Sequence, residues 1–188
     1  MGPLADLHRH LDGSLRPTTL EELAAHARVP VPADLKFHRG MGLDAALARF
    51  AFTLSLLQTP AAVRRVAAEI CEDAAAGGVT TLEIRFAPQL HQGAPIDAIV
   101  DAALDGVGGR AGLILCGLYH EGPQVLGQLV EVASSRPVVG VDLAGGPVPS
   151  GPTLDDYVAP FGRARDLGLG ITVHAAEGRP PAEIRIAI

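Results

Sequence analysis

Hydrophobic and polar positions follow two periods along this chain, one typical of strands and the other typical of helices. Short runs rich in Val, Ile and Leu, such as VTTLEIRFA and VVGVDLA, predict buried strands. Segments in which apolar residues recur every three or four positions predict amphipathic helices. In chain order the predicted strands are 4–10, 79–87, 111–119, 138–144 and 169–175, and the predicted helices are 17–28, 43–57, 60–76, 95–107, 123–134, 153–167 and 180–188.

Capping signals mark the ends of two of these helices. Thr18 and Glu21 have the spacing of a capping box, which predicts a capped start for the first helix. Thr59 followed by Pro60 predicts an N-cap and a first helical residue. Gly77-Gly78 predicts the end of that same helix.

The later strands recur at a nearly constant interval. They begin near 79, 111, 138 and 169, and roughly 30 residues is the repeat of a βα unit with parallel strands. No Gly-rich phosphate-binding segment follows the first strand, as a doubly wound dinucleotide-binding fold would require. Polar residues instead collect at the C-terminal ends of several strands, where barrel enzymes carry their active sites. We therefore predict an α/β fold of the (β/α)₈ TIM-barrel type.

A complete barrel needs more chain than this sequence provides. Eight strands and about 250 residues are typical of a closed barrel, whereas the sequence has 188 residues and five predicted strands. We expect residues 1–188 to form one partial barrel domain, truncated to about the first five βα units. An open sheet leaves its outer strands as edges, so self-association through these edges is expected.

Composition and charge exclude several classes of function. Hydrophobic residues make up 48% and charged residues 19% of the sequence, which indicates a globular protein. The net charge is −6 with scattered Lys and Arg, which argues against nucleic-acid partners and anionic membrane surfaces. Cys71 and Cys116 lie in apolar periodic segments and are predicted to be core thiols. No signal peptide precedes Asp6 and no apolar run reaches the roughly 18 residues of a membrane span, so a cytoplasmic location is expected.

Candidate chemistry begins in the first strand. Residues two apart on a strand share a face, so His8 and His10 project together, and Asp12 follows just beyond the strand end. Two imidazoles on one face can chelate a divalent transition metal, although an isolated H-x-H more often has a surface or packing role. His174 ends the fifth strand, and Glu177 follows three residues later.

Strands 1 and 5 of a barrel face each other across its mouth, which would bring the three histidines to one ion. Zinc accepts three protein ligands and a water molecule in catalytic sites. Glu177 suits a general acid or base near such an ion, and its alternative interpretation is a solvated loop carboxylate.

Three further places along the chain carry polar residues with candidate roles. Asp142 lies near the end of the fourth strand, and Gly145-Gly146 would let a ligand approach the backbone, unless they form a simple turn. Glu83 and Arg85 share one strand face and predict a structural ion pair. Two loop histidines follow the second and third strands, His91 and His120, and they either line the mouth of the barrel or, as is more usual for a lone loop histidine, are solvated.

Four segments, in order, resemble one known family. DLHRHLDGS, LEIRFAPQ, VGVDLAGG and TVHAAEG are similar to the corresponding segments of the adenosine deaminase family, metal-dependent barrel enzymes of the amidohydrolase superfamily. The resemblance implies that His8, His10 and His174 are ligands of one Zn²⁺ ion. It also implies that Glu177 protonates purine N1 while hydroxide attacks C6, the first step of hydrolytic deamination.

The same resemblance implies the substrate-binding residues. His10 and Asp12 match residues that line the nucleoside site, with Asp12 meeting the ribose. Gly145 matches the glycine whose backbone approaches the purine ring. The implied partner is therefore a small purine nucleoside and neither a nucleic acid nor a membrane.

The sequence departs from the family pattern in two ways. The fifth-strand motif usually reads HAGE, and Ala176 replaces its glycine. A GHG motif, whose histidine orients the hydroxide, and a TDD-like motif, whose first aspartate is the remaining zinc ligand, are absent, and Asp155-Asp156 opens a helix instead. The 188-residue chain is therefore expected to be inactive or nearly so alone.

Two other functions stay open from the sequence. The substrate of the parent enzyme is either adenosine or another adenine-bearing metabolite, such as adenine or aminodeoxyfutalosine, because the residues around the metal do not distinguish them. Alternatively, the chain is a non-catalytic remnant that binds zinc or a nucleoside.

Overall fold

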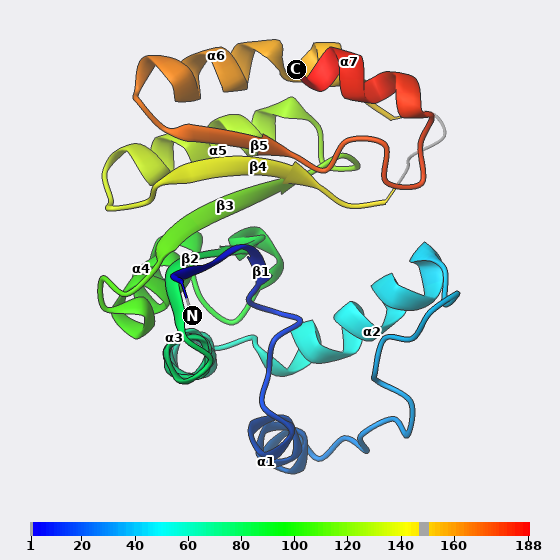
Figure 1. Cartoon of the computed structure of the whole chain (residues 1–188), viewed down its shortest axis with the longest axis vertical. Coiled ribbons are helices and arrows are strands. Elements are labelled where there is room, and N and C mark those ends of the chain that lie inside the picture. The colour runs from blue at the N-terminus through cyan, green and yellow to red at the C-terminus, as the bar shows by residue number, and fades with distance from the viewer. Residues whose placement is uncertain (1, 147–150) are drawn as a thin grey trace. The chain divides into compact units, whose positions relative to one another are not determined.

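A computed structural model describes residues 2–146 and 151–188 of the chain (Figure 1). The chain divides into two compact units, the first ending at Gly112 and the second running from Leu113 to Ile188. Within each unit, strands that neighbour each other in the sheet are also consecutive in sequence. The paired strands within each unit run parallel, as the βα repeat predicts.

Unit 1 is built around a parallel pair of strands covered by helices. Its elements are β1 (Leu4–His10), α1 (Pro17–Ala27), α2 (Leu43–Leu56), α3 (Pro60–Ala76), β2 (Val79–Phe86), the 3₁₀ turn η1 (Pro88–Leu90) and α4 (Ile96–Val107).

The register of β1 against β2 is interrupted close to the histidines. Asp6 pairs with Leu82, and the next pair is Arg9 with Ile84. Three steps along β1 therefore match two along β2, which is the signature of a β-bulge. Such a bulge redirects side chains, and here it lies at the position of His8.

The core of unit 1 forms where α3 packs on α4 and on β2. The apolar face that the periodicity predicts for α3 is buried, and so is the facing side of α4. Gly106 makes the close approach of the two helices feasible, because a Cβ atom there would lie 2.3 Å from the Arg64 carbonyl oxygen. Cys71 is buried with this core, as predicted.

The two predicted helix caps differ in outcome. Thr59 caps α3 and accepts a hydrogen bond from the Ala62 N–H, with Pro60 in the first turn. The capping box at Thr18 and Glu21 is wrong, because α1 already begins at Pro17 and Arg16 is its N-cap residue. Arg16 instead forms an ion pair with Asp73 of α3 at 2.7 Å.

Unit 2 contains three parallel strands and the helices that connect them. Its elements are β3 (Gly112–Leu118), α5 (Pro123–Ser134), β4 (Gly140–Ala144), the 3₁₀ turn η2 (Leu154–Tyr157), α6 (Val158–Asp166), β5 (Gly170–Val173), the 3₁₀ turn η3 (Pro181–Glu183) and α7 (Ile184–Ala187). Cys116, Asp142 and Thr172 lie side by side across the three strands, because Cys116 pairs with Asp142 and Asp142 with Thr172.

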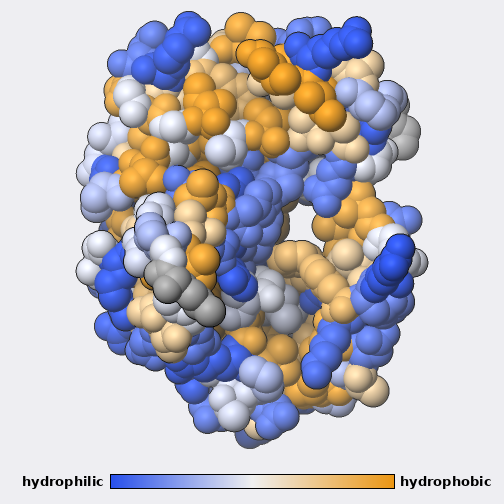
Figure 2. Space-filling view, viewed as in Figure 1, coloured by the Kyte–Doolittle hydropathy of each residue, from blue (hydrophilic) through white to orange (hydrophobic). Residues whose placement is uncertain are grey.

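Every predicted strand and helix is therefore present, with ends shifted by a few residues. Apolar side chains remain exposed on β1, including Leu4 and Leu7, and on α7, including Ile184 and Ile186. Figure 2 shows hydrophobic residues gathered on the side of unit 2 where α6 and α7 lie. In the described part of the chain no single helix is long and apolar enough to cross a membrane, and α2 and α3 satisfy that test only as a joined pair bent by 118°.

Candidate metal and substrate site

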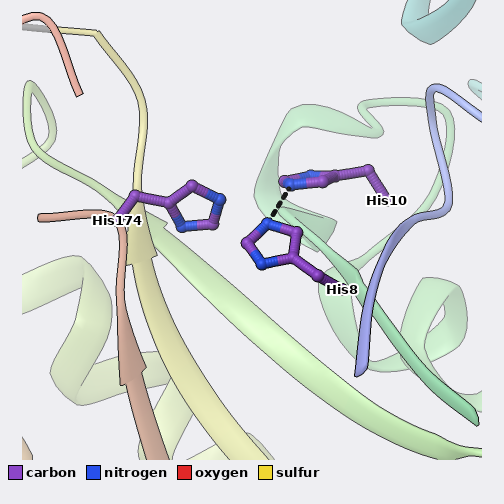
Figure 3. A group of neighbouring side chains, drawn as sticks. All are labelled: His8, His10 and His174. Carbon is purple, nitrogen blue, oxygen red and sulfur yellow. Dashed lines mark hydrogen bonds between the residues drawn. The ribbon is translucent and has the colours of Figure 1, made fainter. Parts of the chain in front are cut away.

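His8 and His10 form the first part of the candidate site, at the C-terminal end of β1. Their Nε2 atoms lie 3.1 Å apart, and their ring centroids are 5.0 Å apart. The two rings point toward each other in Figure 3. The Ser14 hydroxyl donates to the His10 carbonyl oxygen at 2.6 Å, which fixes the backbone after the strand. The predicted shared projection of the two imidazoles is confirmed, and we call them the unit 1 pair.

Asp12 lies just beyond this pair and is buried. Its side-chain Oδ1 has no hydrogen-bond partner among the described residues. Burial raises the pKa of Asp12 to about 6, partly opposed by a backbone hydrogen bond. A buried acceptor without a donor is costly in a folded protein. Such an acceptor fits the expectation that Asp12 meets a ligand hydroxyl, which stays a prediction.

An aromatic ring adjoins both His10 and the turn after it. Phe50 of α2 contacts His10 edge to face, with ring centroids 5.6 Å apart. A Cβ atom at Gly13 would meet the Phe50 ring at 2.6 Å, so glycine there permits this packing. Helix α2 thus contributes an apolar ring next to the unit 1 pair.

His174 and Asp142 form the second part of the candidate site, in unit 2. The His174 Nδ1 atom lies 3.0 Å from Asp142 Oδ2, and the Asp142 side chain is fully buried. The Thr172 hydroxyl donates to Asp142 Oδ1 at 2.9 Å, and the Cys116 thiol lies 3.5 Å from Oδ2. We call His174 and Asp142 the unit 2 pair.

The chemistry of these groups fits a zinc ion. Neutral imidazole nitrogens are common zinc ligands, and a ligating histidine usually directs its other ring nitrogen at a carboxylate or carbonyl group. Asp142 stands in that relation to His174 Nδ1. The unit 1 pair already brings two Nε2 atoms together, as a chelate requires.

The remaining predicted residues lie in turns of unit 2. Gly145 follows β4 with φ of 95°, a conformation that favours glycine. Glu177 is exposed in the turn after His174. Ala176, which stands in place of the family's glycine, has φ of 62°. The structure thus joins His8 to His10 and Asp142 to His174, whereas Glu177, Asp12 and Gly145 stay predictions in their roles.

Several side chains have surroundings or partners that the sequence does not predict. His91 is buried, not solvated, and shares a hydrogen bond of 2.6 Å with the Leu57 carbonyl oxygen, whereas His120 is exposed as predicted. Arg85 is buried and donates to the Leu7 carbonyl oxygen at 2.7 Å, and the expected ion pair of Glu83 and Arg85 stays a prediction. Only the strand register, which needs the fold, reveals that Thr172 and Cys116 flank Asp142.

Comparison with known sequences identifies relatives along almost the whole chain. The family model described as adenosine deaminase matches residues 3–188. Adenosine deaminase of Enterococcus faecalis is 36% identical over 196 residues, which cover 93% of this chain and 57% of the relative. Adenosine deaminase of Escherichia coli O1:K1 is 35% identical over 208 residues, covering 99% of this chain and 62% of the relative. The chain thus spans about 60% of the length of these relatives.

Solved structures agree with the sequence comparison. Adenine deaminase of Arthrobacter aurescens matches with a TM-score of 0.84 at 24% identity, covering 100% of this chain and 62% of the other, and supports the fold. The Arabidopsis N6-methyl-AMP deaminase matches with a TM-score of 0.82 at 27% identity, covering 98% and 62%. An amidohydrolase of Burkholderia ambifaria with bound zinc matches with a TM-score of 0.85 at 26% identity, covering 98% and 55%.

These likenesses settle the fold class and the family. The fold is the predicted (β/α)₈ barrel type, of which this chain contains five strands with their helices. The family model covers far more than half of the chain, and relatives above 30% identity cover nearly all of it. The chain belongs to the adenosine deaminase family.

Proposed function

We propose that this chain supplies the metal-binding and purine-binding residues of a zinc-dependent hydrolytic deaminase. The substrate is adenosine or a related amino-purine nucleoside, and the products are the inosine-type nucleoside and ammonia. The observation that carries the proposal is the facing Nε2 atoms of His8 and His10, 3.1 Å apart at a strand end in a member of this family. His174 is the third proposed ligand, and each histidine offers one ring nitrogen (Figure 3).

The reaction replaces an amino group by oxygen. When bound, zinc supplies an acidified water, whose pKa falls to about 7, as the nucleophile for C6. Glu177 donates a proton to purine N1 while the new C–O bond forms, which keeps the ring from accumulating negative charge. The hydroxyl proton of the adduct then passes to the C6 amino group, the C–N bond breaks, and ammonia leaves with its electron pair as the C6 carbonyl forms.

Other residues of this chain position the substrate. Asp12 accepts a hydrogen bond from a ribose hydroxyl, which would satisfy its buried Oδ1 atom. The backbone at Gly145 approaches the purine ring, where a side chain would take up space. Asp142 holds His174 through Nδ1 and so keeps its other ring nitrogen directed at the ion.

Two substrate classes compete within this proposal. Adenosine is favoured because the relatives at 35% and 36% identity are adenosine deaminases. An amino-purine nucleotide is the alternative, since the Arabidopsis neighbour at 27% identity acts on N6-methyl-AMP. Residues 1–188 contain no GHG or TDD segment. We therefore expect this chain alone to bind zinc and the nucleoside but to convert little or none of the nucleoside.

The deciding experiment measures metal and nucleoside binding by the purified 188-residue chain. We expect one zinc ion per chain, with binding lost in His8→Ala and His174→Ala and kept in His26→Ala, a matched exposed histidine of α1. Adenosine should bind to the zinc-loaded chain more tightly than AMP, as measured by calorimetry. A chain that takes up no zinc, or takes it up equally after both changes, contradicts the proposal.

Turnover is assayed separately with the same protein. Loss of adenine absorbance and release of ammonia are followed with adenosine, adenine and N6-methyl-AMP. We expect little or no conversion by residues 1–188, and rapid conversion of adenosine would overturn this expectation. Tight binding of AMP in preference to adenosine would support the nucleotide alternative.

A further inference from the structure

The segment between β5 and α7 carries Glu177 in a strained turn. Ala176 has a left-handed φ of 62°, a conformation that is unfavourable for a residue with a Cβ atom. Gly178 follows with φ of 64°, where glycine carries no such penalty. Glu177 lies between these two residues, so its direction depends on whether the turn is held. Strain of this kind persists only when surrounding contacts determine the conformation.

Arg179 makes the contacts that close this turn. Its backbone N–H donates to the Ala176 carbonyl oxygen at 3.4 Å. Its guanidinium carbon lies 4.1 Å from the centre of the Tyr119 ring, in a cation–π arrangement. Its Nη1 atom donates to Glu183 Oε1 at 3.0 Å, and the Arg179 side chain is only 10% exposed. The first contact closes the turn itself, and the other two join it to Tyr119 and to η3.

Tyr119, which Arg179 contacts, is itself held in place by several contacts within unit 2. Its side chain is fully buried, and its hydroxyl donates to the His174 carbonyl oxygen at 3.4 Å. Its backbone N–H donates to the Ala144 carbonyl oxygen at 3.0 Å, at the end of β4. Tyr157 packs against it edge to face and donates its hydroxyl to the Tyr119 carbonyl oxygen at 3.1 Å. One ring therefore contacts both the start of the turn, at His174, and its end, at Arg179.

We propose that Arg179, Tyr119 and Glu183 form a clamp that holds the Ala176 turn and thereby positions Glu177. Arg179 is a positioning residue in this proposal, because it acts through the turn and not on a substrate atom. The importance of Glu177 rests on the proposed function, whereas the clamp itself is a property of unit 2 alone. The ion pair also differs from an ordinary surface pair, because both of its partners are largely shielded from water, with 10% and 20% exposure.

The geometry distinguishes two substitutions of Arg179. Lysine keeps a cation near Tyr119 and Glu183, and it removes the Arg179 Nε and Nη2 atoms, which are buried and have no hydrogen-bond partner among the described residues. Glutamine is uncharged and loses both the cation–π contact and the ion pair. Arg185 of α7 is exposed and provides a matched control at another arginine of the same region.

The test measures hydrogen exchange of the amides in residues 174–183 of the metal-free chain. We expect Arg179→Gln to exchange about tenfold faster in this segment, with the melting temperature within about 2 °C of the parent chain. Arg179→Lys should exchange within about twofold of the parent, and Arg185→Gln should be unchanged. Equal exchange in Arg179→Gln and Arg185→Gln would overturn the clamp, as would lysine failing to rescue.

A second change tests the strain directly. Ala176→Gly accepts the left-handed conformation without penalty, so it should recover part of the protection lost in Arg179→Gln. Faster exchange in the double variant than in Arg179→Gln would overturn the role of strain. Zinc binding measured on the same proteins separates the clamp from the proposed deaminase function. If the parent chain binds no zinc, the proposed function fails, whereas the hydrogen-exchange comparison still tests the clamp.

Discussion

The unit 1 pair and the unit 2 pair of the candidate site differ in how their own unit supports them. In unit 1, His8 is exposed and His10 is half-buried, and both lie at the end of β1, most of whose residues are exposed. In unit 2, the His174 side chain is 10% exposed and faces a carboxylate that is fully buried. That carboxylate of Asp142 also accepts a hydrogen bond from Thr172 in the neighbouring strand.

This difference predicts how each pair responds to mutation. A ligand held by a buried partner keeps its orientation before an ion arrives, and its removal disturbs the fold as well as the site. A ligand on an exposed strand end contributes to metal affinity and little to the stability of the metal-free chain. The same proposed role, ligation of one ion, therefore has different structural consequences in the two units.

The largest expected effect is on metal affinity. His8→Ala and His174→Ala should each lower zinc affinity by more than about 100-fold, because even the loss of an outer hydrogen-bond partner lowers it 10- to 100-fold. The two variants should differ in stability when metal-free. We expect less than about 0.5 kcal/mol of change for His8→Ala and about 1–3 kcal/mol of loss for His174→Ala.

Zinc titration and urea unfolding of the same preparations measure these quantities. His26→Ala, an exposed histidine of α1, controls for the loss of a histidine as such. Equal loss of stability in His8→Ala and His174→Ala would remove the distinction between the pairs.

An intermediate effect is expected at Asp142. Asp142→Asn keeps the shape of the side chain, and an amide that donates to His174 would favour the tautomer with its proton on Nε2. That proton blocks ligation, so zinc affinity should fall about 10- to 100-fold. Replacing the charged acceptor of the Thr172 hydroxyl should also lower the unfolding free energy by about 1–3 kcal/mol.

Calorimetric zinc titration and urea unfolding measure both changes. Asp97→Asn, at an acidic residue of the first turn of α4, is the matched control. Unchanged zinc affinity in Asp142→Asn would show that His174 needs no carboxylate partner.

Much of the fold follows from sequence because each βα unit is specified locally. The apolar face of α3, its cap at Thr59 and its end at Gly77 all agree with the structure. The exception at α1 has a local cause, since Pro17 starts the helix earlier than the capping-box pattern allows. Pro is well suited to a first helical turn, where its missing N–H has no intrahelical partner.

The site is less predictable because it depends on neighbours that are distant in sequence. The spacing of His8 and His10 predicts their shared projection, as a strand requires. The partner of His174 is fixed by strand register, and 32 residues separate it from Asp142 in numbering, so no local pattern identifies the pair. No local pattern identifies Arg179 either, because its contact with Tyr119 joins the segment after β5 to the segment after β3.

The smallest expected effect concerns the buried histidine of unit 1, which lies outside both pairs. Burial lowers the pKa of His91, only partly opposed by its hydrogen bond to the Leu57 carbonyl oxygen. The unfolded chain, whose histidine pKa is about 6.5, therefore takes up a proton more readily than the folded chain. The stability that neutral His91 provides is fully present above that pKa and declines as the pH falls, by at most about 1.4 kcal/mol per pH unit.

Urea unfolding of the metal-free chain at about pH 8 and about pH 5 tests this prediction. The parent chain should lose more stability on acidification than His91→Gln, whose amide can still donate to the Leu57 carbonyl oxygen. His120→Gln, at an exposed histidine, should respond to acid as the parent does. An equal loss in the parent and in His91→Gln would place the acid-sensitive group elsewhere. The expected result assigns the acid sensitivity of unit 1 to a histidine that packs in the core, separate from the unit 1 pair that is proposed to bind metal.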